Sequence, residues 1–185
     1  MIAPRLQRQL TDPFRKRINR APSPIIARSV PWLTVCLGSI APTLPTISSA
    51  PLLPPLGFLI LLAWRQTRPG LLPVWAGAIL GLVDDLFSGQ PLGSAVLTWS
   101  LAMFAIEVIE ARIPWRNFAL NWLEAAGIIT AYILLSLAFS NAAGGMTSVG
   151  VVVPQLFMSI LLYPLAGRLV WLFDRARLLP FKVLG

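Results

Sequence analysis

Long apolar intervals separated by short polar ones make up most of this chain. No charged residue occurs between residues 29 and 64, and most later charges lie near the ends of further apolar segments. A helix needs about 20 mainly apolar residues to cross a bilayer. The pattern therefore predicts an all-α membrane protein, a six-helix transmembrane bundle with helices at residues 30–44, 51–65, 71–88, 92–111, 118–139 and 149–173.

The first two predicted helices share one uncharged interval, which is long for one crossing and short for two. Prolines interrupt this interval at Pro42, Pro45, Pro51, Pro54 and Pro55. Arg65 and Arg68 follow it, and only an even number of crossings returns them to the side of the basic N-terminal tail. We therefore expect two short or tilted helices joined by a Pro-rich external turn. Pro73, Pro154 and Pro164 predict kinks in later helices.

Composition supports a membrane environment. Hydrophobic residues make up 56% and charged residues 12% of the 185 positions, and the mean hydropathy is +0.74. An ordinary soluble domain carries about 25% charged residues. We expect a basic N-terminal tail at residues 1–28, a helical transmembrane domain at 29–173 and a basic C-terminal tail at 174–185.

Basic residues fall on one side of the predicted topology. The chain has 15 Lys and Arg against 7 Asp and Glu, and the three external connections of the six-helix arrangement carry none of the basic residues. Because Lys and Arg concentrate in cytoplasmic loops, both termini are expected in the cytoplasm. The N-terminal tail would lie near anionic lipid or dock a cytoplasmic partner. This orientation accounts for the net charge of +8 without nucleic-acid binding.

The chain lacks the residues on which many enzyme mechanisms depend. It contains no histidine, and its one cysteine, Cys36, lies in an apolar segment. Lys16 and Lys182 lie in the tails. These features exclude a histidine general base, a cluster of thiolate metal ligands and a Ser-Lys pair within the membrane. We expect no cofactor, no metal and no enzymatic activity.

Two adjacent carboxylates, Asp84 and Asp85, are the most informative polar feature. Gly77 and Gly81 have Gly-x-x-x-Gly spacing, and at about 100° per residue they share a helix face with both aspartates. Ionisable groups at membrane depth are costly and usually face protein or water. Three interpretations stay open: hydration at the external end of the helix, a packing or capping role, and catalysis or ion transport.

A second polar cluster is predicted at the cytoplasmic side, comprising Glu107, Glu110, Arg112, Arg116 and Glu124. Glu107 and Glu110 share a helix face. They could form salt bridges with the arginines of this cluster or with those after the second helix. The alternative is a binding site for lipid head groups or for a partner's basic residue. An aromatic belt at the membrane interfaces is predicted from Trp64, Trp75, Trp115 and Trp122.

The block around the aspartates resembles the family of rod-shape-determining proteins, MreD. The likeness rests on Gly81-x-x-x-Asp85, the Leu-Phe-Ser-Gly turn that ends with Ser88 and Gly89, and the following Pro91, Leu92 and Gly93. The segment 55–64 and the dipeptide Tyr163-Pro164 before a basic tail are similar too. By this resemblance Asp85 is the aspartate of the family, whereas Asp84 stands where the pattern is ordinarily apolar.

The resemblance implies a fold similar to the substrate-capture subunits of energy-coupling-factor transporters. It also implies a non-enzymatic scaffold or regulatory subunit of the bacterial elongation (rod) complex, located in the inner membrane and contributing to cell shape and peptidoglycan synthesis. The implied partners are membrane lipids, MreC, the actin-like MreB, RodA and its penicillin-binding transpeptidase.

The alternative is a vitamin-binding membrane subunit of an energy-coupling-factor transporter. That function would need a polar pocket open to the external face. The external loops are short and almost featureless, so we expect no such pocket.

Overall fold

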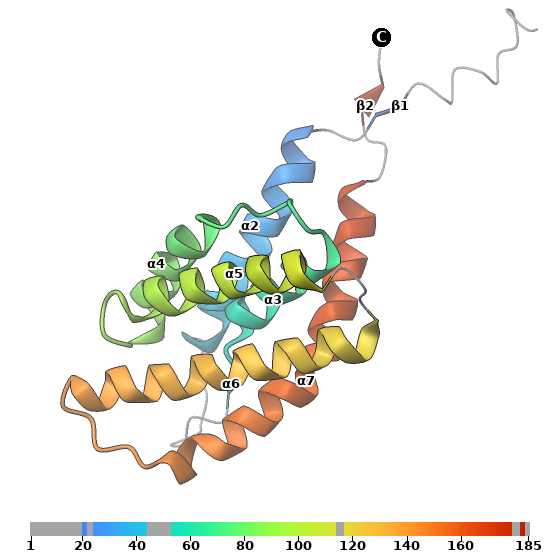
Figure 1. The fold of residues 1–185 in the computed structure, drawn as a ribbon. Helices are drawn as coiled ribbons and strands as arrows, with labels where there is room; N and C mark the ends of the chain where they lie inside the picture. Colours follow the sequence, from blue (N-terminus) through green and yellow to red (C-terminus); the bar gives the residue numbers. More distant parts are fainter. Residues whose placement is uncertain (1–19, 22–23, 44–52, 114–116, 179–181, 184–185) are drawn as a thin grey trace, which may run out of the picture.

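The computed structural model describes residues 20–21, 24–43, 53–113, 117–178 and 182–183, and its domain is helical (Figure 1). The helices are α2 (Pro24–Ile40), η2 (Ala41–Thr43, a 3-10 helix), α3 (Leu56–Thr67), α4 (Ala76–Ser88), α5 (Ser94–Arg112), α6 (Phe118–Ala142) and α7 (Val149–Arg177). Two short strands, β1 (Arg20–Ala21) and β2 (Lys182–Val183), pair antiparallel. The all-α prediction is confirmed for the domain, and the two short strands lie outside it.

Prolines account for the late starts of α3 and α4, whereas α2 begins six residues earlier than predicted, at Pro24, and contains Pro31. Proline lacks an N–H and disfavours helical backbone in the residue before it, so helices commonly start just after one. Accordingly, α3 begins after Pro55 and α4 begins at Ala76, so Pro73 precedes a helix and does not kink one. Pro154 and Pro164 do lie inside α7.

Helix length separates the bundle into two groups. α5, α6 and α7 are long and apolar enough to cross a membrane, whereas α2, α3 and α4 have 17, 12 and 13 residues. At about 1.5 Å per residue, a helix as short as α3 spans about 18 Å, against about 30 Å for the apolar core of a bilayer. Three helices are therefore long and apolar enough to span a membrane, and six crossings stay a prediction.

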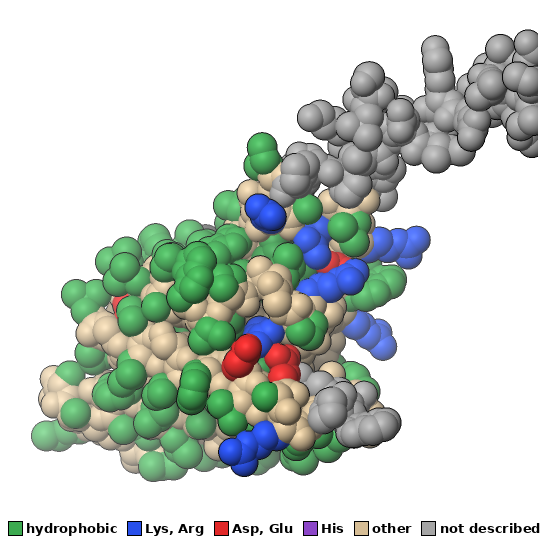
Figure 2. Space-filling view, turned by 45° about the horizontal axis from the view of Figure 1, so that its top comes forward, with side chains coloured by type: hydrophobic (Ala, Val, Ile, Leu, Met, Phe, Trp, Pro, Cys, Tyr) green, Lys and Arg blue, Asp and Glu red, His purple; other side chains and the backbone are tan. Residues whose placement is uncertain are grey.

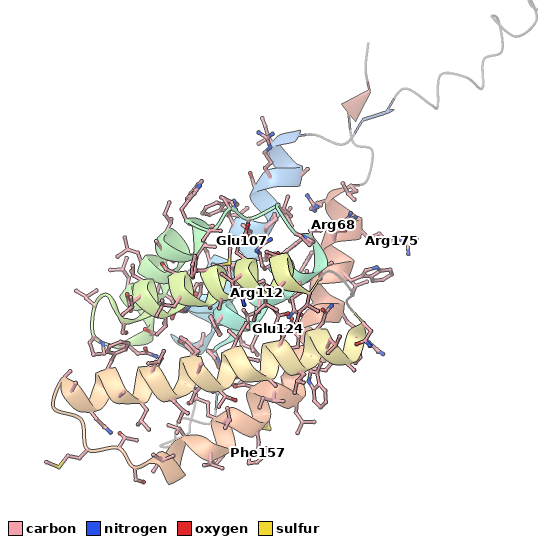
Figure 3. All side chains as sticks on the ribbon, viewed as in Figure 1. Arg68, Glu107, Arg112, Glu124, Phe157 and Arg175 are labelled. Carbon is pink, nitrogen blue, oxygen red and sulfur yellow. The ribbon has the colours of Figure 1, made fainter. Side chains whose placement is uncertain are left out.

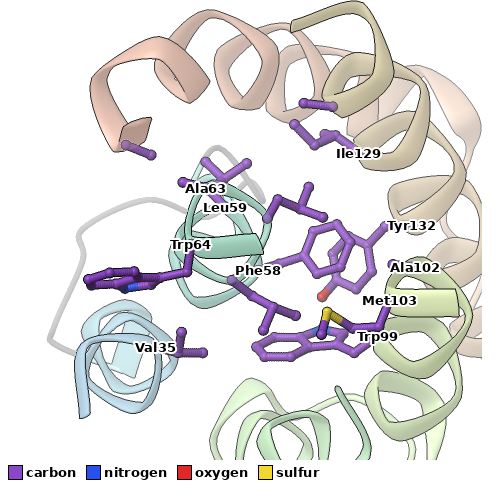
Figure 4. Packing of buried hydrophobic residues seen from close by; sticks show 14 of the residues in the cluster. Val35, Phe58, Leu59, Ala63, Trp64, Trp99, Ala102, Met103, Ile129 and Tyr132 are labelled. Carbon is purple, nitrogen blue, oxygen red and sulfur yellow. The ribbon is translucent and has the colours of Figure 1, made fainter. Parts of the chain in front are cut away.

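The core of the bundle surrounds the short helix α3 (Figure 4). Phe58 is fully buried and stacks on Tyr132 of α6, with ring centroids 4.2 Å apart. Phe58 also lies 5.7 Å from the ring of Trp99 on α5. Because lipid is as apolar as these side chains, such packing stabilises a membrane bundle through close van der Waals contact. The short helix is therefore held by protein on most of its surface.

The predicted aromatic belt loses one of its four tryptophans and otherwise stays a prediction. Trp64 is fully buried, and its Nε1 donates a hydrogen bond to Thr34 Oγ1 at 2.9 Å, so it belongs to the core. Trp75 and Trp122 are 60% and 41% exposed, as interfacial residues would be. Trp115 lies outside the described residues. Burial of Trp64 follows from the central position of α3, which its sequence alone does not reveal.

Hydrophobic side chains cover much of the visible surface (Figure 2). Large apolar residues are exposed on the three long helices, including Phe104, Phe157 and Leu161 at 60%, 62% and 71%. Many of the Lys and Arg side chains in this view lie toward the end of the molecule where the tails leave it. The α4–α5 turn and the α6–α7 loop lie at the opposite end (Figure 1).

Candidate functional site

The backbone of α5 lies directly against the glycines of α4. A Cβ atom added at Gly81 would lie 2.6 Å from the carbonyl oxygen of Ala95, and one added at Gly77 would lie 2.8 Å from the carbonyl oxygen of Trp99. Both distances are too short for a real Cβ contact, so any larger residue forces the helices apart. The structure thus identifies α5 as the helix that packs on the predicted glycine face.

The carboxylate of Asp85 caps the start of α5. Its Oδ2 accepts hydrogen bonds from the backbone N–H groups of Gly93 at 2.9 Å and Val96 at 3.2 Å. Its Oδ1 accepts from the Ala95 N–H at 2.8 Å and from the Ser94 hydroxyl at 3.2 Å. The first N–H groups of a helix have no partner within that helix. Asp85, only 4% exposed, supplies those partners from the preceding helix.

Glycines at the turn make this capping geometry possible. Gly89 ends α4 with a φ of 67°, and Gly93 precedes α5 with a φ of 93°. This left-handed region is accessible to glycine without steric cost. Across these glycines, Ser88 Oγ accepts a long hydrogen bond of 3.5 Å from Gln90 N–H, and Pro91 O accepts one of 3.0 Å from Ser94 N–H.

Leu92 completes the turn and is 76% exposed. Its side chain is available to lipid or to a partner and contributes little to the joint between α4 and α5. We name the contact formed by Gly77, Gly81, Asp85 and residues 93–99 the α4–α5 joint.

Asp84 differs from its neighbour. It is 8% exposed and lines a cavity of about 290 Å³, whose polar residues include Ser39, Gln90, Tyr132 and Ser136. No arginine or lysine pairs with it among the described residues. The expectation that this end of the bundle has no polar pocket is therefore wrong. The cavity is formed largely by helix ends, which the short loops did not suggest.

At the other end of the bundle, Arg65 joins α3 to α5. Its side chain is 4% exposed and forms ion pairs with Glu107 and, at 2.8 Å, with Glu110. The acids are thus paired with an arginine of the second apolar segment, one of the possibilities open from the sequence. Arg112 is exposed and forms no ion pair within the described part of the chain, and Arg116 lies outside the described residues. Figure 3 shows Glu107 and Arg112 on α5, with Glu124 on α6 below them.

Glu124 takes part in a hydrogen-bonded network between three helices. Gln66 Nε2 of α3 donates to Glu124 Oε2 at 2.9 Å and to the carbonyl oxygen of Asn121 at 3.0 Å. The hydroxyl of Tyr163, on α7, donates to Gln66 Oε1 at 2.6 Å. Sequence reasoning did not single out Gln66. An amide in the last turn of an apolar helix was the signal that could have revealed it.

Asp174 is a second buried polar residue that the sequence did not single out. Its Oδ1 accepts from Arg177 Nη2 at 2.6 Å and its Oδ2 accepts from Arg68 Nε at 2.9 Å. Arg177 Nη1 also donates to the carbonyl oxygen of Ala27 at 2.6 Å. The hydrogen bond from Arg68 to Asp174, together with the negative charge of Asp174, raises the pKa of Arg68 above its ordinary value. These contacts join α2, the segment after α3, and α7.

The sequence match to a known protein family covers nearly the same residues as the helical bundle. A sequence model of the family described as rod shape-determining protein MreD matches residues 27–173. The chain belongs to the MreD family. No curated protein and no solved structure matches the chain. Family membership and the three long apolar helices together identify a rod-shape-determining membrane protein.

The MreD family match contains all of the α4–α5 joint and nearly all of the helical bundle. It leaves out most of both tails. The likeness of the MreD family to vitamin-capture subunits stays a prediction, since no solved structure matches.

Proposed function

We propose that this protein is a non-enzymatic scaffold or regulatory subunit of the bacterial elongation (rod) complex. In this proposal it lies in the inner membrane and contributes to cell shape and peptidoglycan synthesis through contacts with MreC, MreB, RodA and its penicillin-binding transpeptidase. Its membership of the MreD family supports the link to rod shape.

One observation supports a scaffold in particular. The buried charged residues of the described chain are Arg65, Asp84, Asp85, Asp174 and Arg177. Except for Asp84, each of them forms a hydrogen bond or ion pair that connects its own helix to a second helix or to the segment that follows α3. Charges used in this way fix the relative positions of helices and leave apolar outer faces for lipid or for partner helices. A protein that presents a fixed surface to several partners needs this property.

The experiment that tests the proposal is replacement of the native copy in a rod-shaped bacterium by a tagged copy. Cells that carry the tagged copy should be rod-shaped, and MreC should co-purify with it. Cells without the protein should be round. A matched assay measures thermal stabilisation of the purified chain by a panel of vitamins. Stabilisation by a vitamin without co-purification of MreC would favour the transporter alternative.

The proposed orientation places both termini and the basic end in the cytoplasm, with six crossings. Single cysteines introduced at Gln90 and Gly145 should react with an impermeant thiol reagent from outside the intact inner membrane. Cysteines at Arg68 and Asn117 should react only after the membrane is opened. Reaction at Arg68 or Asn117 from outside would contradict this topology. Ser48, a third predicted external site, lies outside the described residues.

A further inference from the structure

The cavity beside Asp84 is unlike the other polar sites of the bundle. It lies where α4, the α4–α5 turn, α6 and the start of α7 meet, at the end of the bundle opposite the ion pairs of Arg65 and Asp174. Gln155 of α7 donates to the carbonyl oxygen of Leu53 at 2.9 Å at its edge. Its volume of about 290 Å³ is at the low end for ligand pockets, which are about 300–1,000 Å³.

Asp84 brings an unbalanced carboxylate to this cavity. Its polar neighbours are the Ser39 hydroxyl, the Tyr132 phenol and the second carboxylate, Asp85, and none of these carries positive charge. A buried carboxylate without a cation is costly, so it either takes up a proton or recruits a positive group. Asp85 avoids this cost through four donors from α5, whereas Asp84 has no comparable set among the described residues.

Two serine hydroxyls also line the cavity. The Ser39 and Ser136 hydroxyl oxygens are buried, and neither makes a hydrogen bond of ordinary geometry within the described residues. Ser39 is 3% exposed, and it lies beside Asp84. Each hydroxyl interacts with a neighbour, Ser39 with the Asp84 carboxylate and Ser136 with the Tyr132 phenol, and each keeps hydrogen-bonding capacity for a bound group. A carboxylate with the Ser39 hydroxyl beside it and further acceptor oxygens in the cavity suits a group with several N–H donors.

We propose that the cavity binds the protonated amino group of an aminophospholipid head group, with Asp84 as its counter-ion. The lining contains no Lys or Arg, which disfavours an anionic head group. In the proposed topology the cavity lies at the end of the bundle, at the depth of lipid head groups. Its apolar lining, including Leu53, Leu56 and Val152, suits the glycerol and first acyl carbons of a lipid. This proposal is independent of the role of the protein in cell shape.

The test uses the full chain, purified in mild detergent from membranes that contain phosphatidylethanolamine and phosphatidylglycerol. Native mass spectrometry then measures which lipid is retained by the wild type, by Asp84→Asn and by Glu107→Gln. Asn preserves the size of the side chain and removes its charge, and Glu107 is a carboxylate at the opposite end. Thermal unfolding is measured in vesicles of phosphatidylcholine supplemented with either of the two lipids. A parallel arm adds free ethanolamine to the detergent-purified protein.

We expect the wild type and Glu107→Gln to retain phosphatidylethanolamine and to be stabilised by it in vesicles. Asp84→Asn should bind it about tenfold more weakly or worse, because charge-assisted hydrogen bonds are roughly twice as strong as neutral ones. Stabilisation by ethanolamine alone, with no retained lipid, would overturn the lipid as source. Equal retention by Asp84→Asn, or preference for phosphatidylglycerol, would overturn the proposal. A wild type that neither retains the lipid nor responds to ethanolamine would also overturn the proposal. Asp84 would then be protonated or paired with a partner's basic residue.

Discussion

The two ends of the bundle are held together by different chemistry. At the α4–α5 joint, the Asp85 carboxylate binds mainly backbone N–H groups, whose positions are set by the helix itself. At the basic end, Arg65 and Asp174 bind flexible charged side chains. Ordering long side chains costs conformational entropy, and solvent weakens exposed pairs. We therefore expect the joint to tolerate substitution poorly and the exposed acid at the basic end, Glu107, to tolerate it well.

The adjacent aspartates show the same contrast within one helix turn. Asp85 and Asp84 are both almost fully buried, yet only Asp85 caps a helix. Burial alone therefore does not indicate a structural role, because the partners of the carboxylate decide it. This difference agrees with the family resemblance, in which the position of Asp84 is ordinarily apolar.

The largest effect is expected for Gly81→Leu. The backbone of Ala95 and Val96 occupies the space that a side chain would need, and backbone cannot move aside as a side chain can. Overpacking costs about 1–3 kcal/mol or more, so the unfolding temperature of the purified protein should fall strongly. Gly127→Leu is the matched control, because an added Cβ there meets no atom within 4 Å. Equal loss of stability in both variants would refute the close approach of α5.

A smaller but clear loss of stability is expected for Asp85→Leu. It would leave the N–H groups of Gly93, Ala95 and Val96 without their acceptor, at a cost of about 1–3 kcal/mol. Asp85→Asn keeps one acceptor oxygen and should fall between wild type and Asp85→Leu. Thermal unfolding in the same detergent measures all three. If Asp85→Asn were no better than Asp85→Leu, acceptor loss would not explain the effect.

The smallest effect is expected for Glu107→Gln at the basic end. The Glu107 side chain is 55% exposed, and Arg65 keeps its second partner, Glu110, at 2.8 Å. Exposed ion pairs contribute about 0–1 kcal/mol, so stability should change by less than about 1 kcal/mol and less still in high salt. A change as large as that of Asp85→Leu would remove the proposed contrast between the two ends.

Local features of the sequence predict much of the joint. Glycine spacing predicted the packing face, and a packing or capping role of the aspartates was one of three interpretations that the sequence left open, because both features depend on residues that are close in sequence. The pairs of Arg65 with Glu107 and of Tyr163 with Gln66 join residues 42 and 97 positions apart. No local pattern selects such pairs from the other polar residues.

The cavity could not be predicted for the same reason. Its polar lining comes from α2, α4, α6 and α7, and each contribution looks unremarkable in its own segment. The starts of α3 and α4 were predicted too early because apolar composition continues through the prolines that precede them. Proline chemistry therefore outweighed hydropathy at these boundaries.

We propose that Asp85, through the α4–α5 joint, supports the function in cell shape. The most direct measurement compares Asp85→Leu and Asp84→Leu, at matched expression, for rod-shape complementation and co-purification with MreC. The account predicts that Asp85→Leu loses rod shape and recovers less MreC, whereas Asp84→Leu is milder. A null phenotype for Asp84→Leu together with wild-type behaviour of Asp85→Leu would contradict it.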